Sequence, residues 1–211
     1  MKKRGIVVGG GAFAREILCW AANAQNFAEM PPFKHFLDSN SKALADFPEV
    51  GLSYLGDILT YNPQPNDIFL LGVGDPEIKV RIVERLTALG AEFANIIHIS
   101  AVLSTNARIG KGVIIGPHSY IATHSEIGNY TSINSLTGIG HDAKVGDFCT
   151  ISSQVDVMGN VVICPQAFIG SGARIMPGVT IGHNSKIGAG ALIVRSVRPD
   201  TTMFSAPARK F

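Results

Sequence analysis

The fold of this chain is decided by residues 133–157, which read INSLTGIGHDAKVGDFCTISSQVDV. An aliphatic side chain returns at every sixth position of this stretch, at Ile133, Ile139, Val145, Ile151 and Val157. The same spacing continues without a break from Ile97 to Ile193. A fixed short period over about half of a chain is typical of a solenoid, in which each repeat stacks on the one before it.

The residues around this aliphatic ladder predict that each unit is a short strand followed by a corner. A small or β-branched residue stands two positions before the ladder residue from Ala107 to Ala191, and glycine often follows the ladder residue. A repeat of six residues does not match the period of a helix, but it is three times the two-residue period of a strand. Three units then close one coil, whose parallel strands stack about 4.8 Å apart on the next coil. We expect a prism of about five to six coils, roughly 25 Å long, with the ladder as its core.

Residues 1–95 lie outside this period and have the pattern of a small α/β domain. An apolar strand at 5–8 runs into a glycine loop at 9–14 and then into a predicted helix at 15–26. Further strands are predicted at 33–37 and 67–71, and the second of these leads through 72–75 into a helix at 76–89. Strand, glycine loop and helix open a Rossmann-like unit, in which amides at the helix N-terminus can receive phosphate or another acceptor-rich group.

Three segments of this domain are predicted to meet at one ligand crevice, because the carboxyl ends of parallel strands face the same edge of a sheet. The expected ligand-binding residues are Gly9, Gly10, Gly11, Ala12, Phe13, Asp38, Gly72, Gly74 and Asp75. Asp75 is about equally suited to cap the helix that begins at Pro76. NAD binding is disfavoured, since Ala14 stands where the dinucleotide fingerprint has its third glycine and too few βα units follow.

Composition narrows the classes of partner. The formal net charge is +2 and charged residues make up 16% of the chain, which disfavours nucleic acid and membrane surfaces as partners. The cysteines Cys19, Cys149 and Cys164 show no metal-ligand spacing and indicate reduced packing residues of a cytoplasmic protein. The basic start is followed by a short apolar run, three glycines and Arg15, so we expect no targeting or membrane-spanning segment.

Both parts of the chain together resemble a known family. The segments that carry the resemblance are VGGGAFARE at 8–16, FLD at 36–38, GVGD at 72–75, GHD at 140–142 and SAPAR at 205–209. The sequence is similar over nearly its whole length to bacterial sugar acetyltransferases, in which a small nucleotide-sugar domain precedes a hexapeptide-repeat, left-handed parallel β-helix. Members N-acetylate UDP- or dTDP-linked 4-amino-4,6-dideoxy sugars or GDP-perosamine, and others O-acetylate sialic acid.

The resemblance implies two domains, at 1–95 and 96–211, and acetyl-CoA as the acyl donor with no metal. It also implies a homotrimer with the active site between adjacent subunits. His141 would be the general base, Asp142 would orient its ring, and Asn134 would lie against the acetyl group. A neutral imidazole near pH 7 suits removal of the nucleophile's proton. The sequence departs from a close relative at Ser39, where that relative has a second Asp, and at Thr150, where it has a histidine near coenzyme A.

Stacking of the coils adds expectations of its own. Residues three units apart lie one above another, so Thr123, His141 and Gly159 form a column, and Gly159 leaves space beside the imidazole for a thioester. Ser171 and Ala189 form a second column, whose small side chains leave backbone amides open to pantetheine. The predicted coenzyme residues are Thr150, Gly159, Ser171 and Ala189. Basic residues near the C-terminus either meet the coenzyme phosphates or form a solvated end, namely Lys186, Arg195, Arg198, Arg209 and Lys210.

The sequence alone is also compatible with other functions. Carbonic anhydrases of this fold bind zinc with three histidines across a subunit boundary, and His118, His124 and His141 lie in the right part of the chain with a different spacing. A scaffold without catalysis is also compatible, because a hexapeptide solenoid specifies a fold and no activity. The expected function is acetyl-CoA-dependent N-acetylation of a nucleotide-linked 4-amino-dideoxy sugar. The alternative is O-acetylation of sialic acid or another sugar hydroxyl.

Overall fold

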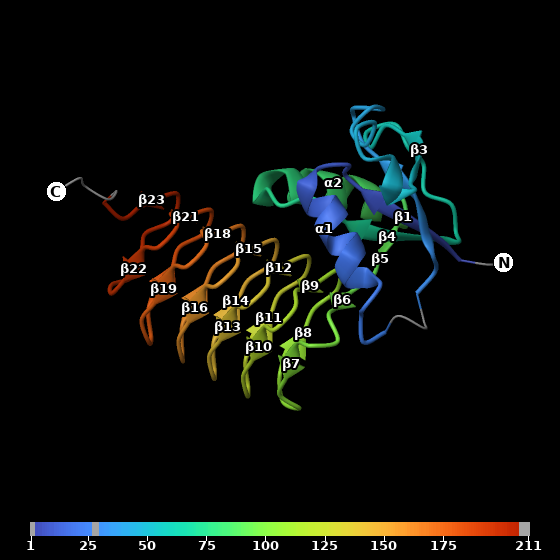
Figure 1. The fold of residues 1–211 in the computed structure, drawn as a ribbon. Helices are drawn as coiled ribbons and strands as arrows, with labels where there is room; N and C mark the ends of the chain where they lie inside the picture. Colours follow the sequence, from blue (N-terminus) through green and yellow to red (C-terminus); the bar gives the residue numbers. More distant parts are fainter. Residues whose placement is uncertain (1–2, 27–29, 207–211) are drawn as a thin grey trace.

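The computed structural model describes residues 3–26 and 30–206, which form a small α/β part and a long parallel β-solenoid (Figure 1). The α/β part has one parallel sheet with strand order β3-β2-β1-β4-β5. Its strands are β1 (Arg4–Val8), β2 (Phe33–Leu37), β3 (Ser53–Gly56), β4 (Asp67–Leu71) and β5 (Glu92–Phe93). The connections hold the helices α1 (Ala12–Ala21) and α2 (Pro76–Ala88) and the short 3₁₀ helix η2 (Pro48–Val50).

The strands predicted at 33–37 and 67–71 are confirmed, and α2 ends one residue before its predicted end. The prediction for the first helix was wrong at both ends. It begins at Ala12 and not at Arg15, because Gly11 is already its N-cap, with φ −76° and ψ −175°. It ends at Ala21, and the following chain turns to the solenoid, where the amide of Gln25 donates to the carbonyl of Ile97.

The solenoid has three faces, each a parallel sheet of two-residue strands. The first face contains β6 (Ile96–Ile97), β9 (Ile114–Ile115), β12 (Ser132–Ile133), β15 (Thr150–Ile151), β18 (Phe168–Ile169), β21 (Lys186–Ile187) and β23 (Thr202–Met203). The second face contains β7 (Val102–Leu103), β10 (Tyr120–Ile121), β13 (Gly138–Ile139), β16 (Asp156–Val157), β19 (Arg174–Ile175) and β22 (Leu192–Ile193). The third face contains β8 (Arg108–Ile109), β11 (Glu126–Ile127), β14 (Lys144–Val145), β17 (Val162–Ile163) and β20 (Thr180–Ile181).

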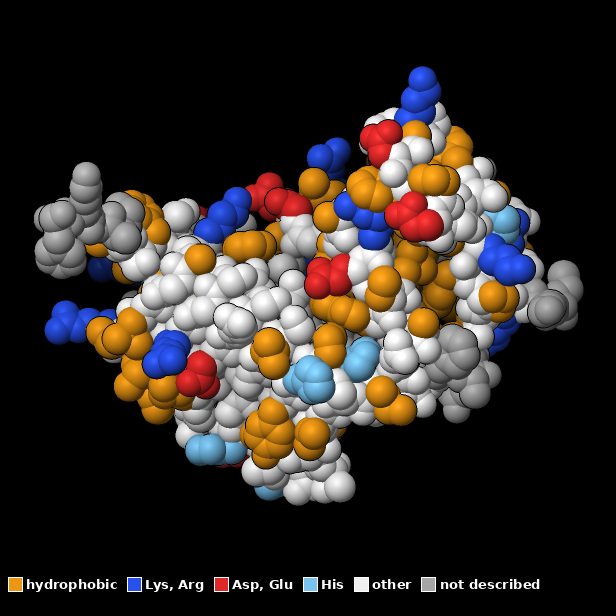
Figure 2. Space-filling model, in the orientation of Figure 1, with side chains coloured by type: hydrophobic (Ala, Val, Ile, Leu, Met, Phe, Trp, Pro, Cys, Tyr) orange, Lys and Arg blue, Asp and Glu red, His pale blue; other side chains and the backbone are white. Residues whose placement is uncertain are grey.

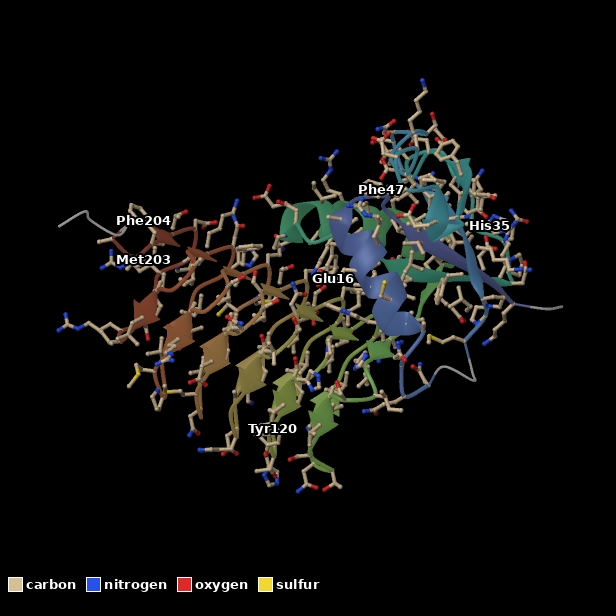
Figure 3. All side chains as sticks on the ribbon, in the orientation of Figure 1. Glu16, His35, Phe47, Tyr120, Met203 and Phe204 are labelled. Atoms are coloured by element: carbon tan, nitrogen blue, oxygen red, sulfur yellow. The ribbon has the colours of Figure 1, made fainter. Side chains whose placement is uncertain are left out.

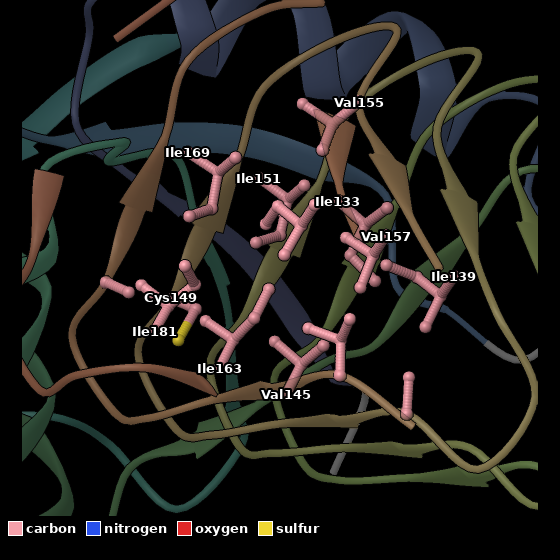
Figure 4. Packing of buried hydrophobic residues seen from close by; sticks show 14 of the residues in the cluster. Ile133, Ile139, Val145, Cys149, Ile151, Val155, Val157, Ile163, Ile169 and Ile181 are labelled. Carbon is pink, nitrogen blue, oxygen red and sulfur yellow. The ribbon is translucent and has the colours of Figure 1, made fainter. Parts of the chain in front are cut away.

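The register confirms the predicted coil, because Ser132 pairs with Thr150 and Ile133 with Ile151 on neighbouring coils. The aliphatic ladder fills the prism, and Figure 4 shows its side chains meeting from all three faces. Cys149 packs in this core as expected, and burial raises the pKa of its thiol to about 12. At the corners, the third residue after each ladder residue from Ile109 to Ile187 takes positive φ, for example 58° at Asp142.

The α/β part covers the first face of the N-terminal coils, while the C-terminal coils extend away from it (Figure 1). Ile96 and Ile114 from that face are buried in one cluster with Ile17 and Trp20 of α1. On the other side of the sheet, the ring of Phe93 meets Tyr130 edge-on at 5.5 Å between centroids. These contacts hold the α/β part at a fixed place along the solenoid. Among the described residues, no helix has the length and apolar character that crossing a membrane requires.

Candidate active site

A pocket of about 380 Å³ lies where β1, β2 and β4 end. It is lined by Gly9, Gly11, Ala12, Phe13, Asp38, Ser39, Ile58, Gly72, Val73, Gly74, Asp75, Ile78 and Ile82. The three segments that were predicted to converge therefore do so, because the carboxyl ends of these parallel strands lie at one edge of the sheet. The volume is within the range of small-molecule sites.

The two aspartates at this pocket hold its loops. Asp38 accepts the amide proton of Gly10 at Oδ2, at 2.7 Å, and that of Asn40 at Oδ1, at 2.8 Å. Asp75 accepts from the amide of Ile78 at 3.0 Å, which confirms its role as the N-cap of α2. Each carboxylate oxygen retains a further lone pair, so Asp38 can still accept a hydrogen bond from a ligand hydroxyl.

The glycines of the pocket fall into two kinds. A Cβ on Gly10 would lie 2.6 Å from the Cβ of Ala43, and one on Gly72 would lie 2.7 Å from the Cβ of Ala14. These two positions need glycine because neighbouring chain segments pack against them. Nothing lies within 4 Å of a Cβ placed on Gly11 or Gly74. Both line the pocket, so a side chain there would enter the space open to a ligand.

His141 lies at the corner after β13, with its side chain 61% exposed. The turn is closed by a hydrogen bond from the amide of Ala143 to the carbonyl of Gly140, and Asp142 occupies its left-handed position. Nδ1 of His141 is 2.8 Å from Oδ2 of Asp142. When Nδ1 carries the proton and donates a hydrogen bond to Asp142, the lone pair of Nε2 is free to accept a proton from a substrate.

Gly159 lies beside the imidazole, as the column of stacked residues predicted. A Cβ at this position would be 2.5 Å from Nε2 and 2.6 Å from Cε1 of His141. The expected use of this space was different, however. The ring of His141 itself occupies it, so Gly159 provides the place where the imidazole rests and does not leave an empty site for a thioester.

Asn134 lies at the preceding corner, after β12. Its Oδ1 is buried and has no hydrogen-bond partner among the described residues, an uncommon state for a polar atom inside a protein. Asn134 stands between the first and second faces, whereas His141 stands between the second and third. A single chain therefore places these two residues at opposite edges of the second face and does not bring them together.

The predicted coenzyme residues are also divided between these two edges. Ser171 and Ala189 are exposed on the same edge as Asn134, and the amide of Gly190 donates to the carbonyl of Ser171 at 2.8 Å. Ala189 accepts a hydrogen bond from the hydroxyl of Ser205 at its carbonyl. Gly159 lies on the edge of His141.

Thr150 does not fit its predicted role at the coenzyme. Its side chain is buried between α2 and the first face, and its hydroxyl is 2.6 Å from the carbonyl of Gly74 and 2.8 Å from Nζ of Lys79. The hydroxyl is thus used within the protein, at the back of the pocket. Lys79 was not among the predicted site residues, although it follows the one-face helical spacing i, i+3, i+4, i+7 together with Ile82, Val83 and Leu86, and this spacing is the signal that could have found it.

The remaining candidates are dispersed. Lys186, Arg195 and Arg198 are exposed near the end of the solenoid, while Arg209 and Lys210 lie outside the described residues. His124 contacts Asn106 and Thr123, and the amide of His118 donates to Ser100. In the part of the chain that the structure describes, no three metal-binding side chains gather in one group.

Comparisons with known proteins agree with this geometry. The family model described as bacterial transferase hexapeptide (six repeats) matches residues 160–195. No curated protein matches by sequence. A mutant of perosamine N-acetyltransferase from Caulobacter crescentus, in complex with CoA and GDP-perosamine, is 26% identical, with a TM-score of 0.82 over 97% of this chain and 95% of that chain.

Two further solved structures are similar over the full length. The acetyltransferase domain of PglB from Neisseria gonorrhoeae, in complex with acetyl coenzyme A, is 25% identical with a TM-score of 0.87, and the match covers 100% of both chains. WeeI from Acinetobacter baumannii shares the fold, with a TM-score of 0.84, 23% identity and 99% of both chains covered. The family model matches part of the hexapeptide ladder, and solved acetyltransferases match both the ladder and the α/β part, so these similarities together indicate an acyltransferase.

Proposed function

We propose that this protein transfers an acetyl group from acetyl-CoA to the amine of a nucleotide-linked 4-amino-4,6-dideoxy sugar. The observation that carries the proposal is the pairing of the His141–Asp142 corner with a glycine-lined pocket at the carboxyl edge of a parallel sheet. A base and an acceptor pocket on one chain suit a group transfer to a small molecule. Perosamine N-acetyltransferase, which is similar over 97% of this chain, was solved with CoA and GDP-perosamine.

In this mechanism the sugar amine attacks the thioester carbon, a C–N bond forms, and the C–S bond breaks. His141 accepts the proton of the amine at Nε2 and returns it to the departing thiolate sulfur. Asp142 accepts a hydrogen bond from the Nδ1–H of His141, which fixes the tautomer and stabilises the imidazolium that forms. Asn134, which is half-buried, lies against the acetyl group and holds the thioester in place.

The proposal includes a homotrimer with the active site between adjacent subunits. Asn134, Ser171 and Ala189 lie on one edge of the second face and His141 on the other, so a neighbouring copy is needed to complete the site. Apolar side chains are exposed along this part of the solenoid, with Val102 at 58%, Tyr120 at 50% and Leu136 at 54% (Figures 2 and 3). Such a surface favours self-association.

We assign residues 1–95 to a Rossmann-like nucleotide-sugar domain and residues 96–211 to a left-handed parallel β-helix. In this proposal Gly9 to Phe13, Asp38 and Gly72 to Asp75 bind the nucleotide part of the acceptor, and all of them except Gly10 line the pocket. The parallel sheet order β3-β2-β1-β4-β5 supports this assignment, because such sheets bind ligands at their carboxyl edge.

The test offers the purified protein acetyl-CoA together with UDP-, dTDP- or GDP-linked 4-amino-4,6-dideoxy sugars and follows the release of the coenzyme thiol. The same amino sugars without a nucleotide serve as the matched control. One nucleotide-linked sugar should react with a kcat/KM at least about 100-fold above its free sugar, since the pocket supplies binding energy for the nucleotide. Equal rates with and without the nucleotide would refute the role of the pocket, and no thiol release with any acceptor would refute the function.

The division of the site between subunits has a separate test. Asn134→Ala and His141→Ala variants should each be nearly inactive, and trimers formed from a mixture of the two should regain activity, because some interfaces then contain both native residues. Mixed trimers as inactive as the parents would show that the site does not form between subunits.

A further inference from the structure

The side chain of Lys79 is completely buried where α2 meets the solenoid. Its ammonium nitrogen is 2.9 Å from Oγ of Ser132, 3.0 Å from the carbonyl oxygen of Cys149 and 2.8 Å from Oγ1 of Thr150. None of the ion pairs found among the described residues includes Lys79. Burying an amine without a carboxylate partner costs several kcal/mol, so these three directed contacts are needed to offset it.

These contacts join two coils of the solenoid to one loop of the pocket. Ser132 and Thr150 are paired residues of β12 and β15 on the first face. The hydroxyl of Thr150 donates in turn to the carbonyl of Gly74, which lines the pocket between β4 and α2. Lys79, Thr150 and Gly74 thus form a continuous chain of hydrogen bonds from the interior of the joint to the wall of the pocket.

One of the three partners of Lys79 also lies close to a proposed active-site residue of the solenoid. Ser132 stands two residues before Asn134, whose buried Oδ1 has no hydrogen-bond partner in the part of the chain that the structure describes. The apolar residues of α2 that face inward, Ile82, Val83 and Leu86, pack in one cluster with the α/β sheet, and Tyr130 and Phe148 of the solenoid pack against that cluster. Apolar packing fixes how close two elements lie, whereas three hydrogen bonds from one nitrogen also fix their direction and register.

We infer that Lys79 is a positioning residue, which through Thr150 sets the pocket loop at Gly74 in register with the coil that carries Asn134. The inference rests on the proposed function, in which the pocket holds the nucleotide and the solenoid carries the chemistry. Loss of the connection leaves both ligands bound but displaces the sugar amine from the thioester. A misplacement of about 1 Å at a reacting centre can lower a rate by about 100-fold.

The test compares Lys79→Met, Thr150→Val and Thr150→Ser with the wild-type protein, and Lys34→Met is the matched control at an exposed lysine of β2. Calorimetry measures the binding of CoA and of UDP, dTDP and GDP, and thiol release measures kcat with the best acceptor. We expect Lys79→Met and Thr150→Val to lower kcat by about 10- to 100-fold while each dissociation constant changes by less than about 2-fold. Thr150→Ser, which keeps the hydroxyl, should restore most of the rate, and Lys34→Met should match the wild type.

Four other results would overturn the inference. A wild-type kcat in folded Thr150→Val would overturn the inference, as would equal losses in Thr150→Val and Thr150→Ser. Loss of nucleotide binding in parallel with kcat would show that the hydrogen bonds only build the pocket, which also overturns it. Absence of acetyl transfer by the wild-type protein to every nucleotide-linked sugar would refute the proposed function, and the inference with it. Because Thr150→Val keeps the shape of the side chain, the test does not depend on whether Lys79→Met folds.

Discussion

Replacing Gly159 by Ala should disable the enzyme by moving a single ring. The added Cβ would lie 2.5 Å from Nε2, 2.6 Å from Cε1 and 3.0 Å from Cδ2 of His141, whereas ordinary contacts begin at 3.4 Å. The imidazole must therefore shift by about 1 Å. A displacement of this size at a general base lowers kcat by about 100-fold. The ring is largely exposed and can move without disturbing the core, so the free energy of unfolding should change by less than about 1 kcal/mol.

The assay is thiol release at saturating acetyl-CoA and acceptor, together with urea unfolding of the same preparations. The matched control is the same substitution in a His141→Ala background, where no ring is present to be displaced. There, Gly159→Ala should cause no further loss, because the two changes act through one group. A folded Gly159→Ala variant with wild-type kcat would refute the claim that catalysis depends on the position of the His141 ring. An equal loss in both backgrounds would show that Gly159 acts on something other than His141.

Three more predictions concern separate parts of the molecule. His141→Ala should lower kcat by about 100- to 10,000-fold and leave acetyl-CoA binding unchanged, measured by turnover and calorimetry, and a near-normal kcat would exclude His141 as the base. Gly11→Val should raise the acceptor KM and spare acetyl-CoA binding, because the new side chain enters open pocket space without contacting the protein; an unchanged KM would place the nucleotide elsewhere. Burial lowers the pKa of Lys79 from 10.5 to about 7. Between these values the unfolded chain holds a proton that the folded protein lacks, so the free energy of unfolding rises with pH, by about 2 kcal/mol from pH 7 to 9. Urea titrations should show this gain in the wild type and not in Lys79→Met, and equal pH slopes would contradict it.

The solenoid could be predicted from sequence because the pattern that specifies it is contained in each short repeat. Each unit repeats the same short strand and corner, so Ile133, Ile139 and Val145 report the fold wherever the pattern is read. The α/β part was predicted less completely. Strands β1 and β4 are largely buried apolar runs, and β2 ends on the buried Phe36 and Leu37. By contrast, β3 is half exposed and β5 has only two residues, and neither differs from a loop by composition.

The candidate site, too, was predicted only in part from the sequence. The pocket segments could be predicted because strand ends of a parallel sheet meet at one edge, whatever their distance in sequence. The hydrogen bond between Lys79 and Thr150 could not, since it joins residues 71 positions apart, one on a helix and one on a solenoid strand. The stacking rule placed Gly159 beside His141 but could not tell that the ring would turn onto it.

The acceptor is the central claim, and one comparison tests it most directly. The purified protein receives acetyl-CoA with a nucleotide-linked 4-amino-4,6-dideoxy sugar and, separately, with free sialic acid, and both thiol release and the acetylated atom are measured. We expect thiol release with the amino sugar alone, an acetyl group on its nitrogen, and a kcat/KM that rises with pH until the substrate amine is neutral. Thiol release with sialic acid alone, and acetyl on its oxygen, would contradict the account.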